Sequence, residues 1–383
     1  MAANRKTKVV LITEIISPYR IPVFNEIAKN PEIDLTVFFL AETEPERLWR
    51  VETEKIRFPY KMIPGYRIPL PDRFPVFLNP SLGVSLKEEN PDVVICGGYH
   101  HPSSLLALCY ARKHRKRFLL WCESHGQSIH LNAPPFSWYR NYFIRSCNGF
   151  LVPGKKSSDF IKSFGVNGRG IWGVPNAVDN EFFSSKANEY RLRADKEKER
   201  RGFPSKIILY VGRLVDSKGI RTLLEAFKEI SNAPDIGIVL AGEGKDKKKH
   251  MDYCRARRLK NVFFEGFKQQ EELPFYYGIA DLLVLPSNRE EWGLVLNEAA
   301  ASGLPLIATN ISGGGHDLIE EERNGFLVPP GDAGLLRQKI LILLNDPQLK
   351  ASMGECSRRK AEQFSPARCA EGFVNAIFEG RKQ

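Results

Sequence analysis

Residues 207–219, Ile-Ile-Leu-Tyr-Val-Gly-Arg-Leu-Val-Asp-Ser-Lys-Gly, decide the fold of the second half of the chain. The first five residues are an uninterrupted apolar run, which is typical of a parallel strand covered on both faces. Arg213 and Lys218 follow where this strand ends and a helix is expected to begin. Two cations beside the free amides of a helix start suit an anionic diphosphate. Taken alone, the stretch leaves incidental surface charge as the alternative.

Similar apolar runs recur on both sides of this stretch, separated by amphipathic segments. This alternation is typical of α/β proteins with parallel sheets. Strands are expected at residues 9–12, 35–40, 93–96, 118–121, 149–152, 207–211, 236–241, 262–264, 282–285, 305–308 and 325–328. The predicted fold class is α/β, with two doubly wound, Rossmann-like domains that face each other across a cleft. Ligands of such sheets bind outside the carboxyl ends of the strands.

The length of 383 residues exceeds what one hydrophobic core usually supports. We expect an N-terminal domain over residues 1–180, completed by a C-terminal helix at 365–383, and a second domain over 181–364. The charged, strand-free residues 184–205 are interpreted as a linker. Residues 43–82, rich in Pro, Phe and Arg, are expected to form an irregular excursion.

The chain carries a net charge of +11, concentrated in basic runs at residues 112–117, 191–201 and 245–249. Solvated helix faces are the preferred interpretation of these runs, and contact with an anionic membrane surface is the alternative. No aromatic residues interleave with the charges, so nucleic acid is not an expected partner.

Neither the cysteines nor the hydropathy pattern indicates secretion. Seven scattered cysteines without a Cys-x-x-Cys pair favour a reducing compartment and no zinc site. The N-terminus lacks a signal-peptide pattern, and no apolar run approaches the roughly 20 residues needed to span a bilayer. The expected location is the cytoplasm, with peripheral attachment to the inner face of the membrane as an option.

Two further strands of the second domain end in polar motifs. Ala-Gly-Glu-Gly at 241–244 allows the backbone to approach a ligand closely, although a plain turn explains it equally well. Glu290, Gly293 and Glu298 follow the strand at 282–285. If Gly293 opens a helix, its amides can receive phosphate, and the two carboxylates lie about 12 Å apart along a full helix. A structural role for these carboxylates remains open at this point.

The four motifs occur in a fixed order, each at the carboxyl end of an expected strand. They are Gly-Arg-Leu-x-x-x-Lys-Gly, Ala-Gly-Glu-Gly, Ser-x-x-Glu-x-Trp-Gly-Leu-x-x-x-Glu-Ala and Gly-Gly-Gly-His-Asp-Leu-Ile. This ordered set resembles the family-4 retaining glycosyltransferases, which have the two-domain GT-B fold. The resemblance covers residues 206–345 and the stretch Val-Pro-Asn-Ala-Val-Asp at 174–179.

The resemblance implies a role for each matching residue of the second domain. Arg213 and Lys218 should grip the donor diphosphate, while Glu298 should bind the ribose hydroxyls. Glu290 should face the donor sugar. The remaining donor contacts are expected from Gly242, from Phe267 beside the base, and from the amides of Gly293 and Leu294.

In the first domain the resemblance is thinner, because Pro18-Tyr19-Arg20 follows the first strand where many relatives carry a Gly-Gly pair. Family members often place a histidine after the strand that here ends at Trp121, reaching the donor sugar. We therefore expect His125 to be the catalytic residue of this domain. Glu123 and His101 are the alternatives, as is an ordinary loop histidine.

The expected function is a retaining transfer of a sugar from a nucleotide diphosphate sugar to a glycan or lipid-linked saccharide. Glu290, His125, Arg213 and Lys218 form the expected catalytic group. No cofactor and no metal are expected, because no Asp-x-Asp motif ends a strand. The alternatives are an inactive nucleotide-sugar-binding scaffold and an epimerase or phosphorylase of the same fold.

Overall fold

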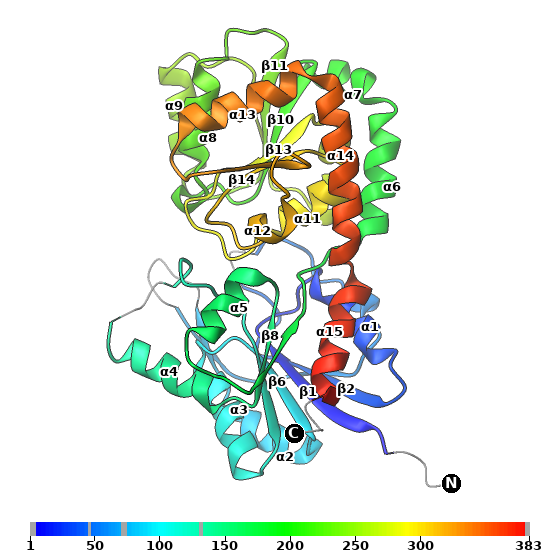
Figure 1. The fold of residues 1–383 in the computed structure, drawn as a ribbon, viewed down its shortest axis with the longest axis vertical. Coiled ribbons are helices and arrows are strands. Elements are labelled where there is room, and N and C mark those ends of the chain that lie inside the picture. Colours follow the sequence, from blue (N-terminus) through cyan, green and yellow to red (C-terminus); the bar gives the residue numbers. More distant parts are fainter. Residues whose placement is uncertain (1–4, 45–46, 70–74, 130–132, 380–383) are drawn as a thin grey trace. The chain divides into compact units, whose positions relative to one another are not determined.

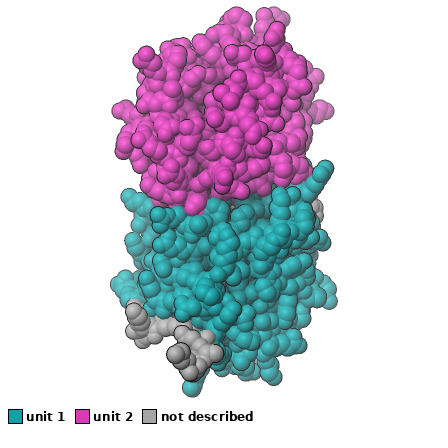
Figure 2. Space-filling model, turned by 90° about the vertical axis from the view of Figure 1, so that its right-hand side faces the viewer, with its two compact units in different colours: residues 1–177, 366–383 teal, residues 178–365 magenta. Residues whose placement is uncertain are grey.

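A computed structural model describes residues 5–44, 47–69, 75–129 and 133–379. The chain forms two compact units, coloured separately in Figure 2. Unit 1 contains residues 1–177 and 366–383, and unit 2 contains residues 178–365. None of the described helices has an apolar stretch long enough to cross a bilayer.

Unit 1 is built on a parallel sheet that, within the described residues, has seven strands in the order β3-β2-β1-β6-β7-β8-β9 (Figure 1). These strands are β1 (Thr7–Thr13), β2 (Ile33–Phe39), β3 (Tyr60–Met62), β6 (Val93–Gly97), β7 (Arg117–Trp121), β8 (Gly149–Val152) and β9 (Gly170–Gly173). A separate antiparallel pair joins β4 (Tyr66–Ile68) to β5 (Val76–Leu78). The helical segments are η1 (Thr53–Lys55), α1 (Arg20–Ala28), α2 (Leu82–Glu89), α3 (Pro102–Lys113), α4 (Phe136–Ser146), α5 (Lys155–Lys162) and α15 (Pro366–Glu379).

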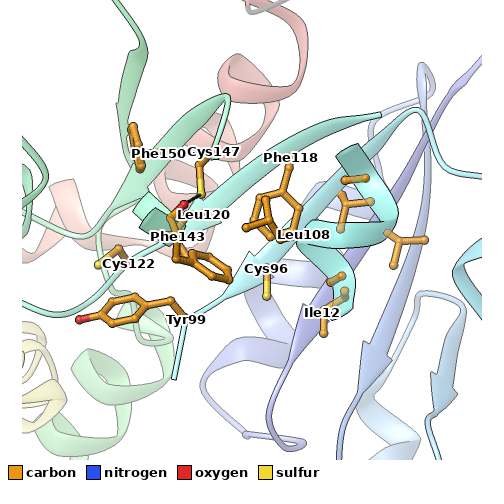
Figure 3. Packing of buried hydrophobic residues seen from close by; sticks show 14 of the residues in the cluster. Ile12, Cys96, Tyr99, Leu108, Phe118, Leu120, Cys122, Phe143, Cys147 and Phe150 are labelled. Carbon is orange, nitrogen blue, oxygen red and sulfur yellow. Dashed lines mark hydrogen bonds between the residues drawn. The ribbon is translucent and has the colours of Figure 1, made fainter. Parts of the chain in front are cut away.

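Both faces of this sheet are covered, because successive side chains of a strand point to opposite faces. In β1, Val10 and Ile12 join a core beneath α2, α3 and α4, where Phe143 packs near Phe118 and Leu108 (Figure 3). The alternating residues of β1 join a second core with α1 and α15. Burial on both faces explains why the strands appear in the sequence as continuous apolar runs.

The C-terminal helix α15 is an integral part of unit 1. Phe373 is fully buried and meets the ring of Trp121 edge-on at 5.2 Å between centroids. Arg117 donates to the carbonyl of Ile377 at 2.9 Å. Gly372 lies so close to β9 that a methyl group on it would be 2.0 Å from the carbonyl oxygen of Gly173. Unit 1 therefore needs residues from both ends of the chain.

Unit 2 contains the second parallel sheet, whose described strands follow the order β12-β11-β10-β13-β14-β15. They are β10 (Lys206–Val211), β11 (Ile236–Ala241), β12 (Val262–Gly266), β13 (Leu282–Leu285), β14 (Leu306–Thr309) and β15 (Gly325–Val328). The α-helices are α6 (Asn180–Arg191), α7 (Ala194–Arg201), α8 (Ile220–Lys228), α9 (Lys247–Ala256), α10 (Leu273–Ile279), α11 (Leu294–Ala301), α12 (Gly315–Leu318), α13 (Ala333–Asn345) and α14 (Pro347–Ala361). Short 3-10 turns are η2 (Asp216–Lys218), η3 (Gln270–Glu272) and η4 (Glu362–Phe364).

The predicted α/β class with two Rossmann-like sheets is confirmed. Every expected strand is present, and its bounds lie within a few residues of those expected. The interpretation of residues 184–205 as a linker is wrong, because α6 and α7 occupy most of this stretch. Asp179 caps α6 by accepting a hydrogen bond from the amide of Phe182. The buried pair Phe183 and Ala187, four residues apart, packs α6 against the rest of unit 2. Most charged residues of the stretch are exposed, but Lys198 of α7 is buried and Arg191 donates to the carbonyl of Ser302.

Residues 43–82 are less irregular than expected. They contain η1 and the short strands β3, β4 and β5. All three residues of β3 and of β4 are exposed, so these strands lack the apolar run that marks a buried strand. Residues 45–46 and 70–74 of this stretch lie outside the described residues.

We predict that Gly372→Ala destabilises unit 1, although alanine normally favours a helix by up to about 1 kcal/mol over glycine. The new methyl group would clash with the Gly173 carbonyl, and such overpacking typically costs about 1–3 kcal/mol. Gly83→Ala in α2 is the matched control, because a methyl group there meets nothing within 4 Å. Thermal unfolding followed by circular dichroism should show a lower Tm for the first variant only. Equal Tm values for both variants would contradict the close packing of α15 on β9.

Candidate functional site

The sheet of unit 2 has a switch point at the adjacent strands β10 and β13, from which the chain continues to opposite sides of the sheet. The chain runs outward from β10 to β11 and β12 on one side, and from β13 to β15 on the other. At such a switch point the following loops turn to opposite faces and leave a crevice outside the carboxyl ends. The first candidate site is built from the loops that follow β10 and β13.

A cation from one loop and a carboxylate from the other meet at this switch point. The Lys218 ammonium lies 2.5 Å from Oε2 of Glu290, and the same oxygen accepts a hydrogen bond from the Ser287 hydroxyl at 3.1 Å. Only 16% of the Lys218 side chain and 11% of the Glu290 side chain are exposed. The structure therefore brings together two residues predicted from separate motifs, 72 positions apart in sequence.

Close backbone contacts hold the two loops in place. Gly219 has a φ of +66°, and a methyl group on it would lie 1.9 Å from the carbonyl oxygen of Pro286. The amides of Asn288 and Arg289 both donate to the carbonyl of Ser217, at 2.9 and 3.0 Å. Only glycine tolerates both the left-handed backbone and this approach. Lys218 is thus fixed directly beside the end of β13.

Arg213 lies half-buried in the first of these loops. Its carbonyl accepts a hydrogen bond from the hydroxyl of Tyr210, which is fully buried in β10. Burial, together with the nearby Glu290 carboxylate, raises the pKa of Tyr210 well above its ordinary value. Tyr210 therefore stays protonated and keeps its donor role, which fixes the backbone that carries Arg213. No sequence pattern marks Tyr210, because in a strand it resembles any other core aromatic.

Gly242 lies at the end of β11, against the same loop. A methyl group on Gly242 would be 1.8 Å from the carbonyl oxygen of Gly212, so the two loops touch through their backbones. Phe267 follows β12, two strands away from β10, and its side chain is half-buried. Gly242 thus shapes the switch-point loops, whereas Phe267 lies toward the edge of the sheet.

Gly293 caps helix α11, as the sequence predicted conditionally, and Leu294 is the first helical residue. The φ of Gly293 is +93°, and a methyl group on it would lie 2.7 Å from Leu285. The first amides of a helix lack intrahelical partners, so they can face an anion. The Ser312 hydroxyl and the Gly314 amide bind the carbonyl of Trp292 and hold this helix start.

Glu298 does not reach the surface of unit 2. Its side chain is fully buried in α11, where one carboxylate oxygen accepts a short hydrogen bond from the Tyr277 hydroxyl. The neighbouring Asn297 is equally buried and accepts a hydrogen bond from the indole of Trp292 at 2.8 Å. The structure therefore places Glu298 behind the helix start rather than beside Glu290. Tyr277, 21 positions earlier, carries no motif that would have identified it.

Unit 1 repeats this arrangement at its own switch point, between β1 and β6. Glu14 follows β1 and His101 follows β6, and Oε1 of Glu14 lies 2.9 Å from Nε2 of His101. Nδ1 of His101 accepts the amide of Phe77 at 3.2 Å. Nδ1 is thus occupied by a backbone amide, and Nε2 is the ring nitrogen that faces the Glu14 carboxylate.

Burial alone would raise the pKa of Glu14, but the hydrogen bond with His101 and the surrounding positive charges, including Arg20, lower it to about 2. Glu14 is therefore a carboxylate at neutral pH, with 34% of its side chain exposed. It can accept a hydrogen bond from an incoming hydroxyl group. The sequence indicates His101 only as an alternative to His125, and no motif marks Glu14.

Arg20 is held at the same edge of the sheet. Its guanidinium stacks 4.5 Å above the ring of Trp121 and lies 3.3 Å from the Glu123 carboxylate. It also donates to the hydroxyl of Thr13 at the end of β1. The motif Pro-Tyr-Arg thus delivers a positioned cation to the carboxyl ends of β1 and β7, which the sequence pattern alone did not indicate.

His125 lies in the loop after β7 and is buried. Its amide donates to the Ser128 hydroxyl at 3.0 Å, and its carbonyl accepts the amide of Ser128 at 2.9 Å. A tight turn therefore fixes His125 at the carboxyl edge where Glu123 and Arg20 lie. The first-domain residues named by the sequence share one edge of the sheet with the Glu14–His101 pair.

Two Rossmann-like units in one chain define the class of protein: they are the architecture of the GT-B fold. HepE of Anabaena, solved in complex with UDP, has this fold, with a TM-score of 0.76 at 17% identity over 98% of this chain and 100% of HepE.

Sequence comparison identifies the family. Residues 193–360 match the family described as glycosyl transferases group 1, and residues 31–182 match glycosyltransferase family 4. An uncharacterized glycosyltransferase of Methanocaldococcus jannaschii is 32% identical over 45% of this chain and 47% of the relative. A GDP-mannose-dependent alpha-mannosyltransferase of Corynebacterium glutamicum is 29% identical over 70% of this chain and 62% of the relative.

The chain spans about half the length of the curated relatives it matches. The two family matches together cover most of the chain, one in each unit. The chain therefore belongs to the family-4-type glycosyltransferases of the GT-B fold, as the ordered motifs of the sequence predicted.

We predict that Glu14→Gln flattens the acid dependence of stability. A carboxylate whose pKa is lowered from 4.5 to about 2 in the folded state stabilises it above pH 4.5, and this contribution is lost as the pH falls toward 2. Urea unfolding at several pH values between 2 and 5 should show a smaller loss for Glu14→Gln than for the unmodified chain. Glu32→Gln, at an exposed carboxylate of the same unit, is the control. Parallel pH curves for all three proteins would contradict the assigned pair.

Proposed function

We propose that this protein is a retaining glycosyltransferase that moves a sugar from a nucleotide diphosphate sugar to a saccharide or lipid-linked saccharide. The observation that carries the proposal is the partly buried contact between Lys218 and Glu290 at the switch point of unit 2. A cation that is already held there by a carboxylate can exchange that partner for a phosphate oxygen without leaving its place. Arg213 lies in the same loop and supplies the second charge.

The diphosphate leaves with its negative charge facing Arg213, Lys218 and the amides at the start of α11. Such fixed donors stabilise a developing charge without reorganisation during the reaction. We propose that they suffice without a metal ion. Glu290 faces the donor sugar. Lys218 holds the Glu290 carboxylate in place until the donor diphosphate binds. Fully buried Glu298 then serves the nucleotide only if the Tyr277 hydrogen bond opens.

The transfer keeps the anomeric configuration because the acceptor attacks from the face that the diphosphate leaves. The bond between C1 of the sugar and the phosphate oxygen breaks, and a bond between C1 and the acceptor oxygen forms. The acceptor proton passes to the departing phosphate oxygen, so no enzyme-bound sugar ester is required. His125 contributes by contacting the donor sugar.

Unit 1 recognises the acceptor in this proposal. The Glu14 carboxylate is ionised and 34% exposed, and its partner His101 keeps it in position. Saccharides present many hydroxyl donors, which a fixed carboxylate can accept. The Arg20 guanidinium, stacked on Trp121, supplies donors for ring or hydroxyl oxygens beside it.

The test is a thermal-shift screen of the purified chain against UDP-, GDP-, ADP- and CMP-sugars in the presence of EDTA. A donor at 100 times its dissociation constant adds about 2.7 kcal/mol of stability, which is a visible shift. We expect one diphosphate sugar to stabilise the chain and to be hydrolysed slowly, with or without EDTA. An α-linked donor should release an α-configured product, observable by NMR. Response only without EDTA, or an inverted product, contradicts the proposed mechanism. Stabilisation without hydrolysis favours an inactive nucleotide-sugar-binding scaffold, and no response at all contradicts the proposed donor site.

We predict that Arg213→Ala weakens binding of the nucleoside diphosphate by about ten-fold to a hundred-fold, because hydrogen bonds to charged groups contribute about 1.5–3 kcal/mol. The Tm of the empty protein should barely change, since the buried core around β10 is untouched. Titration calorimetry measures the affinity. Arg255→Ala is the matched control, because Arg255 is exposed on α9 and paired with Asp252. A large fall in Tm with unchanged affinity would make Arg213 a structural residue instead.

A further inference from the structure

A strongly cationic hollow lies at the amino edge of the unit 1 sheet, opposite the edge that carries Glu14 and His125. It encloses about 580 Å³ and lies where α3 and α4 end and where β7, β8 and β9 begin. Its lining consists of Ala111, Arg112, Arg115, Lys116, Arg117, Arg145, Ser146, Asn148 and Arg169. No part of the proposed donor or acceptor site includes these residues.

Six of the nine lining residues are arginine or lysine, and none is acidic. Neutral oxygen atoms hold several of them: Arg145 donates to the Phe164 carbonyl, Arg169 to the Arg145 carbonyl and Lys116 to the Asn90 side chain. The carboxyl ends of two helices supply roughly half a negative charge each. The guanidinium of Arg117 is turned toward α15, where it donates to the Ile377 carbonyl. The other five cations still exceed the helix-end charges by far, so the hollow keeps a net positive potential.

An exposed aromatic stripe on α4 leads into this hollow. Trp138, Tyr142 and Arg145 are spaced by four and three residues, so they share one helical face. The Trp138 side chain is 70% exposed and that of Tyr142 is 53% exposed. The opposite face of α4 is buried through Phe143, which points into the core in Figure 3.

Arg112 joins the stripe to the hollow. Its guanidinium donates to the hydroxyl of Tyr142 and to the hydroxyl of Ser146, both at 3.2 Å. The aromatic residues and the cations therefore form one continuous surface on α3 and α4. Aromatic side chains with a polar end prefer the boundary between lipid headgroups and acyl chains, and arginine pairs well with phosphate.

We infer that the α3–α4 surface of unit 1 docks on an anionic phospholipid bilayer. Lipid phosphates occupy the arginine hollow, while Trp138 and Tyr142 enter the headgroup region. Inorganic pyrophosphate would use the hollow but has no need of the aromatic stripe. Single-stranded RNA could stack bases on the stripe, so the test below separates it from the bilayer. The inference extends beyond the proposed function, because it concerns the edge of unit 1 that lies opposite the candidate acceptor residues.

Co-sedimentation of the full chain with vesicles tests this surface. We expect binding to phosphatidylcholine vesicles that contain 30% phosphatidylglycerol, little binding to pure phosphatidylcholine, and loss of binding in 0.5 M salt. Arg112→Ala with Arg145→Ala should weaken binding about five-fold per charge removed. Lys248→Ala with Lys260→Ala is the matched control, because both lysines are exposed in unit 2 and removal takes away the same charge.

The aromatic stripe has a readout of its own. Brominated lipids should quench the fluorescence of the unmodified chain, and Trp138→Phe should remove most of that quenching while leaving the Tm unchanged. Equal binding by the two double variants, or absence of binding to anionic vesicles at low salt, would overturn the inference. Quenching that persists in the Trp138→Phe variant would also overturn the inference. Binding of inorganic pyrophosphate or RNA at the hollow without vesicle binding would replace the bilayer by a soluble anion.

Discussion

The candidate site of unit 2 depends on the switch point of its sheet, where the chain continues from β10 to one side and from β13 to the other. The loops that follow β10 and β13 meet beyond the carboxyl ends of these strands, where the amides of Asn288 and Arg289 donate to the Ser217 carbonyl. Lys218 and Glu290 pair in the same place, 2.5 Å apart. The close approach of Gly219 to Pro286 joins the same two loops, while Gly242 packs the loop after β11 against Gly212. A larger residue at Gly219 would push the paired loops apart.

Unit 1 meets the same constraint with different residues. Its sheet reverses at β1 and β6, and there Glu14 pairs with His101. In both units one partner is a carboxylate and the other carries a side-chain nitrogen. Each switch point therefore already holds a charged group with which a ligand can form a hydrogen bond or an ion pair. The two sites differ in the sign of their exposed charge. The loop that carries Lys218 also carries the cation Arg213, whereas in unit 1 the Glu14 carboxylate is ionised and partly exposed.

Much of this architecture was predictable from the sequence, and the failures have physical causes. Strands covered on both faces leave continuous apolar runs, so β10 and its buried neighbours were identified, whereas exposed β3 and β4 left no such signal. Helices α6 and α7 were mistaken for a linker because charge dominates them and only Phe183 and Ala187 face inward along α6. Ordered motifs located Lys218 and Glu290. Contacts between distant residues without motifs, such as Glu14 with His101, needed the folded chain.

Hydrogen–deuterium exchange with and without a saturating nucleoside diphosphate tests most directly whether the switch point of unit 2 is the donor site. The amides of residues 212–219 belong to the loop after β10, and those of residues 287–296 lead into α11. A diphosphate bound there should slow exchange in both stretches and leave the arginine hollow of unit 1 unchanged. Protection confined to unit 1, or unchanged exchange in both stretches despite measurable binding, would contradict the account.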